Sequence, residues 1–385
     1  MTDVLEDRVR TRLADLGSQG LLRHPRPPSG LDLCSNDYLG LATHPSVVQR
    51  LRDALARDGC GSTGSRLLRG HRESFSAIER RFAALKRTER SLYFSSGYLA
   101  NLAVLSTLPE AEDVVFSDAH NHASLIDGLR LSRARRVVFP HNDVDALSKL
   151  LTEDNGPGQR FVAVESLFSM DGDFAPLAEY ASACRRAGAL LVVDEAHAVG
   201  VYGDDGSGLI RATGIADDVL VSVNTAGKAL GVAGAFVAGP AWAIDYLEQR
   251  ARPFVFSTAA PPALAAALEA ALDAVAAEPE RRQQLHARVV FLRTKLAEIG
   301  IPLSPDASQI IPVVVGENEE AVRLAAALQH LGFDVRAIRP PSVPVGTARL
   351  RISLNTGLSE DDLERFVGAL QPCLEEVASC SAGSS

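Results

Sequence analysis

Two side chains that can do chemistry stand at the ends of two apolar segments. Lys228 follows the apolar run 219–223, in a glycine-rich turn that begins at Gly227. Asp194 ends the run 189–193, and ligands collect at the carboxyl ends of strands in open α/β sheets. A lysine amine can form a Schiff base with a carbonyl cofactor, and pyridoxal phosphate also needs an acid that keeps its ring nitrogen protonated. Each residue alone is more simply a solvated loop lysine or a helix cap, but the pair favours pyridoxal phosphate as the cofactor.

A third segment has the pattern of an anion site. Residues 91–101 read as a strand, a tight turn at Gly97 and the start of a helix. Free N–H groups at a helix N-terminus, approached past a residue without a side chain, suit a phosphate dianion. Without other information, a plain strand-to-helix turn is the simpler interpretation.

Histidines occur close to two predicted strand ends. His120 and His122 follow the apolar run 114–116, and their His-x-His spacing raises the question of a metal site. No third ligand is spaced to complete such a site, so we expect no metal. An imidazole can instead lie flat on a pyridine ring. His197, three residues after Asp194, is by itself consistent with a core histidine that donates to backbone.

Two arginines share one face of a predicted strand. Arg349 and Arg351 alternate with Leu350 and Ile352, so both guanidinium groups point to the same side. A guanidinium can bind a carboxylate through two parallel hydrogen bonds. This face is therefore a candidate site for a carboxylate substrate.

The composition is that of a globular protein. The chain has 385 residues, of which 46% are hydrophobic, and this length suggests two lobes. A net charge of −9 without a basic run argues against nucleic acid or a membrane surface as a partner. The N-terminus has no apolar signal core, and no segment is expected to span a membrane. The five cysteines show no C-x-x-C spacing, so we expect reduced, cytoplasmic thiols rather than disulfides or zinc.

The elements that must position these residues alternate along the chain. The strand-helix pattern over residues 90–240 predicts a mostly parallel sheet with helices on both faces, and the flanking segments predict a smaller α+β lobe. The smaller lobe is expected to contain strands at 310–315 and 335–338. The expected division has four parts. Residues 1–45 form an N-terminal segment that packs with the small domain, and residues 46–255 form the large domain. Residues 256–378 form the small domain, and residues 379–385 form a disordered tail.

Several motifs resemble one known family. Asp-Glu-Ala-His at 194–197, followed by Thr-x-Gly-Lys-Ala-Leu-Gly at 225–231, is similar to the α-oxoamine synthases. Ser-Asn-Asp-Tyr-Leu-Gly at 35–40 and Phe-Ser-Met-Asp-Gly-Asp at 168–173 are characteristic of the same group. These enzymes are fold-type I pyridoxal phosphate enzymes that condense an amino acid with an acyl thioester. The resemblance, over about residues 20–375, implies an aspartate-aminotransferase-like fold with a seven-stranded, mostly parallel sheet.

The resemblance also implies roles for individual residues. Lys228 would carry the cofactor and act as general base, with Asp194 on the ring nitrogen, His122 on the ring face and His197 on the phenolic oxygen. The implied cofactor contacts come from Gly97, Tyr98, His122, Ser169, Asp194, His197, Thr225 and Lys228. Ser257 and Thr258 match a segment that reaches the cofactor phosphate of the neighbouring subunit, which implies a homodimer with shared active sites.

Substrate contacts carry over in the same way. Asn36 and Arg351 match residues that bind the amino-acid carboxylate, Arg23 and Ser342 lie in segments that face the acyl chain, and His122 faces the substrate. Without the resemblance, Arg23 is more simply a solvated arginine and Asn36 an ordinary turn residue.

The reaction that the resemblance implies is a decarboxylative condensation. The segment 338–351 is most similar to the branch of the family that joins L-alanine to a pimeloyl thioester in biotin synthesis, with coenzyme A or acyl carrier protein as the carrier. The alternatives are a branch that uses glycine and acetyl-CoA, an aminotransferase, and a non-catalytic partner subunit. The presence of Lys228, Asp194, His122 and His197 argues against a non-catalytic subunit.

Overall fold

The structure is a computed structural model that describes residues 2–382, and the chain divides into two compact units. The larger unit comprises residues 37–169 and 174–283. The smaller unit comprises the residues up to 36, residues 170–173 and the residues from 284 onward.

This division differs from the boundaries expected at residues 45 and 255. Helix α11 (Ala263–Ala277) packs on α2 (Pro45–Asp58) and α3 (Glu73–Lys86). The residues from 256 to 283, which were expected in the small domain, therefore belong to the larger unit. Apolar contacts between helices far apart in the sequence therefore decide the division.

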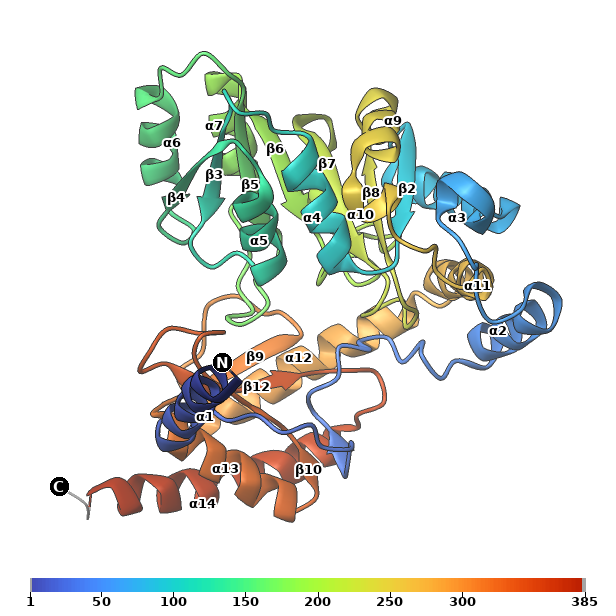
Figure 1. Ribbon diagram of the computed structural model, residues 1–385. Helices are drawn as coiled ribbons and strands as arrows, with labels where there is room; N and C mark the ends of the chain where they lie inside the picture. Colours follow the sequence, from blue (N-terminus) through green and yellow to red (C-terminus); the bar gives the residue numbers. More distant parts are fainter. Residues whose placement is uncertain (1, 383–385) are drawn as a thin grey trace. The chain divides into compact units, whose positions relative to one another are not determined.

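A seven-stranded sheet forms the centre of the larger unit (Figure 1). Its strands, in spatial order, are β2 (Arg90–Phe94), β8 (Ala235–Gly239), β7 (Val219–Thr225), β6 (Leu190–Asp194), β5 (Arg160–Glu165), β3 (Val114–Asp118) and β4 (Arg135–Phe139). Strand β8 is antiparallel to both neighbours, and the other neighbouring strands are parallel to each other. The predicted α/β class with a mostly parallel sheet is confirmed. The carboxyl ends of β6, β5, β3 and β7 consequently lie along one edge of the sheet.

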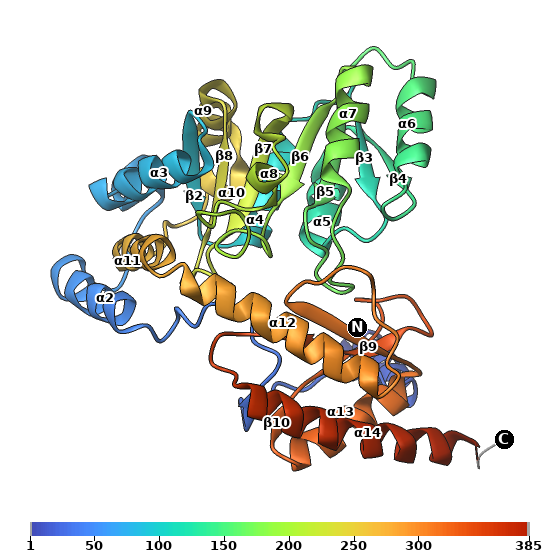
Figure 2. The ribbon, with the colours of Figure 1, turned by 180° about the vertical axis from the view of Figure 1, so that it is seen from behind.

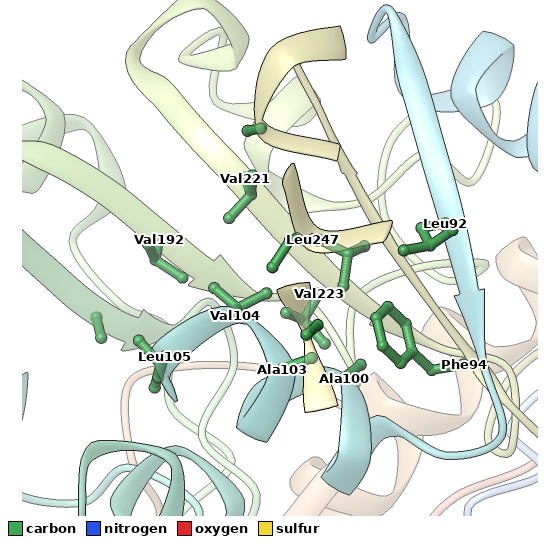
Figure 3. Close-up of a cluster of buried hydrophobic side chains, with 14 of the residues drawn as sticks. Leu92, Phe94, Ala100, Ala103, Val104, Leu105, Val192, Val221, Val223 and Leu247 are labelled. Atoms are coloured by element: carbon green, nitrogen blue, oxygen red, sulfur yellow. The ribbon is translucent and has the colours of Figure 1, made fainter. Parts of the chain in front are cut away.

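Helices cover both faces of this sheet (Figures 1 and 2). One face carries α4 (Gly97–Thr107), α5 (Ala123–Leu131), α9 (Ala241–Arg250) and α10 (Arg252–Val255). The other carries α3, α6 (Val144–Glu153), α7 (Leu177–Ala187) and α8 (Leu209–Ala212). Figure 3 shows part of the first layer, where Ala100, Ala103 and Val104 of α4 pack with Val221 and Val223 of β7. Burial of each larger aliphatic side chain in such a layer contributes about 1.5–3 kcal/mol, which holds α4 rigidly on the sheet.

The smaller unit contains two small sheets and four long helical segments. Strands β11 (Ala337–Ile338), β12 (Ala348–Ser353) and β9 (Ile310–Gly316) form an antiparallel sheet, and β1 (Leu31–Asp32) pairs in parallel with β10 (Phe333–Asp334). The helices are α1 (Thr2–Ser18), the part of α12 (Glu280–Glu298) after residue 283, α13 (Asn318–His330) and α14 (Glu360–Ala382). The expected single strand at 335–338 is wrong, because β10 and β11 pair with partners in different sheets.

Both ends of the chain belong to the smaller unit. The residues after α1 bond to the C-terminal part, since Asn318 Nδ2 donates to the Gln19 carbonyl at 3.2 Å. A disordered tail was expected over 379–385, but α14 continues through Ala382. Residues 383–385 lie outside the described residues.

Among the described residues, no helix combines the length and the apolar character that crossing a membrane requires.

Candidate active site

The junction of β2 and α4 forms a capped helix N-terminus. Ser96 has an extended backbone, and its hydroxyl accepts a hydrogen bond from the Leu99 N–H at 3.2 Å, so it caps the helix that starts at Gly97. A Cβ atom on Gly97 would lie 3.1 Å from Thr225 Oγ1. Glycine therefore lets the helix N-terminus lie close to a buried hydroxyl, and the free N–H groups of such a terminus suit a phosphate group.

Tyr98 follows on the exposed side of the same turn. Its side chain is 41% exposed, and its hydroxyl donates to the Asp127 carboxylate on α5. This hydrogen bond raises the pKa of Tyr98 and lowers the pKa of Asp127. The phenol is therefore held as a neutral group beside the helix start.

Lys228 lies at the start of a short chain of polar groups. Its Nζ is 2.6 Å from His197 Nε2, and His197 Nδ1 is 2.6 Å from the hydroxyl of Tyr38. Lys228 is half-buried, whereas His197 and Tyr38 are buried. When Lys228 is an ammonium, His197 Nε2 accepts and Nδ1–H donates to Tyr38. The structure thus brings Lys228 and His197 together, and adds Tyr38.

Asp194 ends β6 as a buried carboxylate. Its Oδ1 accepts from the Ala196 N–H at 2.8 Å, and its Oδ2 accepts from Asn101 Nδ2 at 2.6 Å. Both oxygens therefore serve as acceptors. This donor set fits an acid that pairs with the protonated nitrogen of a pyridine ring.

A second carboxyl group, which the sequence analysis did not assign, lies beside Asp194. Glu165 ends β5 directly opposite Asp194 in the strand register, and it accepts from the His122 N–H at 2.6 Å. Burial, with the Asp194 charge as a further cause, raises the pKa of Glu165 to about 8. Glu165 therefore keeps its proton near neutral pH, and Asp194 carries the negative charge of the pair. The position of Glu165 at the end of a predicted strand is the sequence feature that could have identified it as a site residue.

His122 lies at the N-terminus of α5. Its Nδ1 is 2.7 Å from Ser124 Oγ and accepts from the Ser124 N–H at 3.2 Å. Partial burial lowers the pKa of His122, with the positive charge of Lys228 acting in the same direction and Asp194 opposing both. The residue remains accessible to solvent, so a neutral imidazole is available to a ring. His120 instead stacks on His141, with ring centroids 4.0 Å apart.

Two predicted hydroxyl groups lie in loops that follow strand ends. Ser169 is buried, and its N–H bonds to the Glu165 carboxyl group. Thr225 is buried at the end of β7, where its hydroxyl donates to the Gly234 carbonyl at 3.3 Å. Both residues therefore belong to the same sheet edge as Asp194.

The predicted hydroxyl pair Ser257 and Thr258 follows α10. Thr258 forms an isolated antiparallel bridge with Ser65, which lies in the glycine-rich loop 59–70. The Ala259 N–H donates to the Gly64 carbonyl of the same loop at 2.9 Å. Ser257 is half-buried and Thr258 is exposed. The glycine-rich loop thus holds this segment in place with its hydroxyl groups accessible.

The predicted substrate residues lie in the smaller unit. Arg351 is buried, and its Nη1 donates to Asn36 Oδ1 at 3.1 Å and to Ser353 Oγ at 2.6 Å. Arg349, on the same face of β12, instead forms an ion pair with Asp171. The two arginines therefore have different partners, and Arg351 is the one that lies beside Asn36.

Arg23 and Ser342 meet at one backbone group. The guanidinium of Arg23 donates to the carbonyls of Arg339 and Pro340 at 3.2 and 3.1 Å, and the Ser342 N–H donates to the same Arg339 carbonyl at 3.1 Å. Arg23 and Ser342 are both exposed. The two predicted acyl-chain residues are thus neighbours in the smaller unit.

Comparison with known proteins gives consistent results. The family model for class I and II aminotransferases matches residues 28–370. An 8-amino-7-oxononanoate synthase from Marinobacter nauticus is 45% identical, over 94% of this chain and 91% of its own length. The one from Anaeromyxobacter dehalogenans is 48% identical, over 90% of this chain and 87% of its own length.

Solved structures agree with these relatives. A serine palmitoyltransferase from S. paucimobilis has a TM-score of 0.90 at 29% identity, with 97% of both chains covered, and holds pyridoxal phosphate joined to myriocin. The 8-amino-7-oxononanoate synthase from Francisella tularensis has a TM-score of 0.79 at 29% identity, over 90% of this chain and 98% of that one. The chain therefore belongs to the class I and II aminotransferase family of pyridoxal phosphate enzymes, in its α-oxoamine synthase group.

Proposed function

We propose that this protein condenses L-alanine with a pimeloyl thioester to form 8-amino-7-oxononanoate, releasing carbon dioxide and the thiol carrier. The relatives are named for this product, and the family resemblance assigns the step to biotin synthesis. The observation that carries the proposal is the grouping of Lys228, His197 and Asp194 along one sheet edge, in a chain 45–48% identical to those relatives.

The residues present fit pyridoxal phosphate. The Gly97 turn and Thr225 would hold the phosphate, Asp194 the ring nitrogen and Lys228 the carbonyl carbon, while His122 would lie against the ring. When bound, pyridoxal phosphate supplies an electron sink that stabilises negative charge on the α-carbon of an amino acid. A buried, hydrogen-bonded carboxylate beside the ring nitrogen would stabilise the protonated form of that nitrogen.

Lys228 is the group proposed to move the α-proton. Because its Nζ lies 2.6 Å from His197 Nε2, His197 can accept a proton from the ammonium and leave a free amine as the base. Tyr38 fixes the orientation of this imidazole through the other ring nitrogen. The three groups form a path for one proton away from the reacting carbon.

Arg351 is the proposed partner of the alanine carboxylate. Its strand, β12, is the central strand of its sheet, and Asn36 and Ser353 hold its guanidinium in place. A guanidinium preorganised in this way loses less side-chain entropy on binding than a mobile one. Arg23 and Ser342 are proposed to contact the acyl chain, whose far carboxylate would pair with the Arg23 cation.

The test is turnover of purified protein with alanine or glycine against pimeloyl-, acetyl- and octanoyl-CoA, and against pimeloyl acyl carrier protein. Alanine with a pimeloyl thioester should have the highest kcat/KM. The preference for alanine over glycine should correspond to about 1–3 kcal/mol, the value of one methyl group in a pocket. Highest activity with glycine and acetyl-CoA, or with octanoyl-CoA, would contradict the proposal and leave the cofactor assignment intact.

Lys228→Ala is the control for the cofactor chemistry. The variant should lose the visible absorption band of the covalently bound cofactor, and borohydride should label Lys228 in the wild-type protein alone. A label that maps to another lysine would contradict the role of Lys228.

A further inference from the structure

Asn101 is a buried amide on α4 to which the proposed chemistry assigns no role. It lies four residues after Gly97, about one helical turn from the phosphate site, and it is 2% exposed. Its Nδ2 lies 2.6 Å from Asp194 Oδ2 and 2.9 Å from Ser124 Oγ. An amide nitrogen has two hydrogens, so each of these acceptors receives one.

The orientation of this amide follows from the charge beside it. If the amide were turned over, its carbonyl oxygen would face the Asp194 carboxylate, and the two acceptors would repel each other. Within residues 2–382, Asn101 Oδ1 has no hydrogen-bond partner. The side chain therefore acts at this place as a double donor.

Ser124 passes the effect of Asn101 on to His122. Because Ser124 Oγ accepts from Asn101, its single O–H is directed to the other neighbour, His122 Nδ1, at 2.7 Å. The Ser124 N–H also points to this nitrogen, at 3.2 Å. His122 Nδ1 thus accepts from both the O–H and the N–H of Ser124, so the neutral imidazole carries its proton on Nε2.

We propose that Asn101 is a positioning residue that holds Asp194 as a hydrogen-bonded carboxylate and fixes His122 in the tautomer protonated at Nε2. Asn101 of α4 then orients both Asp194, the proposed partner of the ring nitrogen, and His122, the proposed group on the ring face. The N-terminus of the same helix is the proposed phosphate site. This inference rests on the proposed use of pyridoxal phosphate, but it does not depend on the acyl substrate.

Asn101→Ala and Ser124→Ala separate the two proposed effects of Asn101, which are the hydrogen bond to Asp194 and the tautomer of His122. Removing a hydrogen bond to a buried charge should raise the Kd for pyridoxal phosphate, titrated into cofactor-free protein, about tenfold or more in Asn101→Ala. The ¹⁵N NMR shifts of His122, assigned by their loss in His122→Gln, should change from the Nε2–H tautomer to a mixture. Ser124→Ala should change the tautomer while its Kd stays within about threefold of wild type.

Asn224→Ala is the matched control. Asn224 is also a buried amide, and its Nδ2 donates to Ser222 Oγ at 2.9 Å. Because it neighbours Val223, which packs with α4, its side chain lies on the opposite face of β7. Its loss should lower the melting temperature while leaving the Kd within about threefold and the His122 tautomer unchanged.

The proposal is overturned if Asn101→Ala binds pyridoxal phosphate within about threefold of wild type, or if His122 keeps its Nε2–H tautomer in that variant. If Asn101→Ala does not fold, Asn101→Leu, which is close to asparagine in size and has neither a donor nor a charge, provides the same two measurements. Failure of wild-type protein to bind pyridoxal phosphate would overturn the proposed function, and the tautomer of His122 in cofactor-free protein would still test the link through Ser124.

Discussion

Asp194 and Glu165 illustrate how neighbouring carboxyl groups acquire different states. Both end a parallel strand, and they are direct partners in the register of β5 and β6. Asp194 accepts from a side-chain amide and a backbone N–H, whereas burial beside that charge raises the pKa of Glu165 to about 8. One group is thus suited to pair with a cation and the other to remain neutral.

This difference predicts a dependence of stability on pH. The ordinary pKa of a glutamate here is 4.5, so between about 4.5 and about 8 the unfolded chain loses the Glu165 proton while the folded protein keeps it. Wild-type stability from this group is full below that window and falls as the pH rises through it. Glu165→Gln has no proton to lose.

The melting temperature of cofactor-free Glu165→Gln, relative to wild type, should therefore rise between pH 5 and pH 8 and level off above. Calorimetry across this range checks the prediction. A difference that is constant with pH would mean that Glu165 is ionised in the folded protein throughout.

Arg351 allows a second prediction at the scale of one residue. Arg351→Lys keeps the charge but loses the planar fork, so kcat/KM for alanine should fall at least about tenfold, equivalent to the 1.5–3 kcal/mol of a charged hydrogen bond. The KM for the acyl thioester should change little. Arg349→Lys is the control on the same face of β12, because its partner is Asp171. Equal losses in both variants would indicate a structural role alone.

At the scale of elements, a buried ion pair joins α3 to the loop after β6. Lys86, at the end of α3, donates to the Glu195 carboxylate and to the Ser207 carbonyl. Glu195 also accepts from the Ile210 N–H at 2.8 Å, at the start of α8. Because Glu195 directly follows Asp194, this pair anchors the loop that carries both Asp194 and His197.

Lys86→Met should therefore destabilise the protein by about 3–5 kcal/mol, since it leaves a buried carboxylate without its partner. Lys86→Met combined with Glu195→Gln should recover part of this loss. The exposed pair Arg80–Glu73 is the control, and Arg80→Met should cost less than about 1 kcal/mol. Denaturant titration of these three variants and of the wild type measures the differences. A loss in Lys86→Met no larger than in Arg80→Met would contradict the anchoring role.

At the scale of the whole molecule, the accessible segment at Ser257 and Thr258 supports the proposal of a shared-site dimer. The residue before it, Phe256, is 73% exposed and lies under the Arg252 guanidinium at 4.9 Å. Trp242 of the same unit is 62% exposed. Aromatic side chains are enriched in protein interfaces relative to the rest of the protein surface.

Mixing two inactive variants tests this arrangement. Lys228→Ala subunits are combined with subunits in which Ser257 and Thr258 are both alanine. If the hydroxyl pair serves the partner's site, each hybrid dimer contains one intact site, and an equal random mixture should recover about a quarter of wild-type activity. If every site is built from one chain, each site in a hybrid keeps one defect and no activity returns.

The fold class and the cofactor could be predicted because they depend on local patterns. The apolar run that ends at Asp194, the run that precedes the turn with Lys228, and a glycine at a helix start are each readable within a few residues of sequence. The sequence pattern also predicts helices over 177–187 and 241–250, and α7 and α9 have those bounds. Periodicity and helix-end signals act over one or two turns, which is the range that sequence patterns cover.

The sequence by itself therefore determined the α/β class, the family and the cofactor, and it named the residues that the sheet edge assembles. Only the tertiary structure decided which groups lie next to them. Asn101 meets Asp194 across 93 residues, and Tyr38 meets His197 across 159. Such contacts depend on how separate strands and helices pack. The same packing decides whether a carboxyl group such as Glu165 holds its proton, because burial and neighbouring charge, rather than residue type, set its pKa.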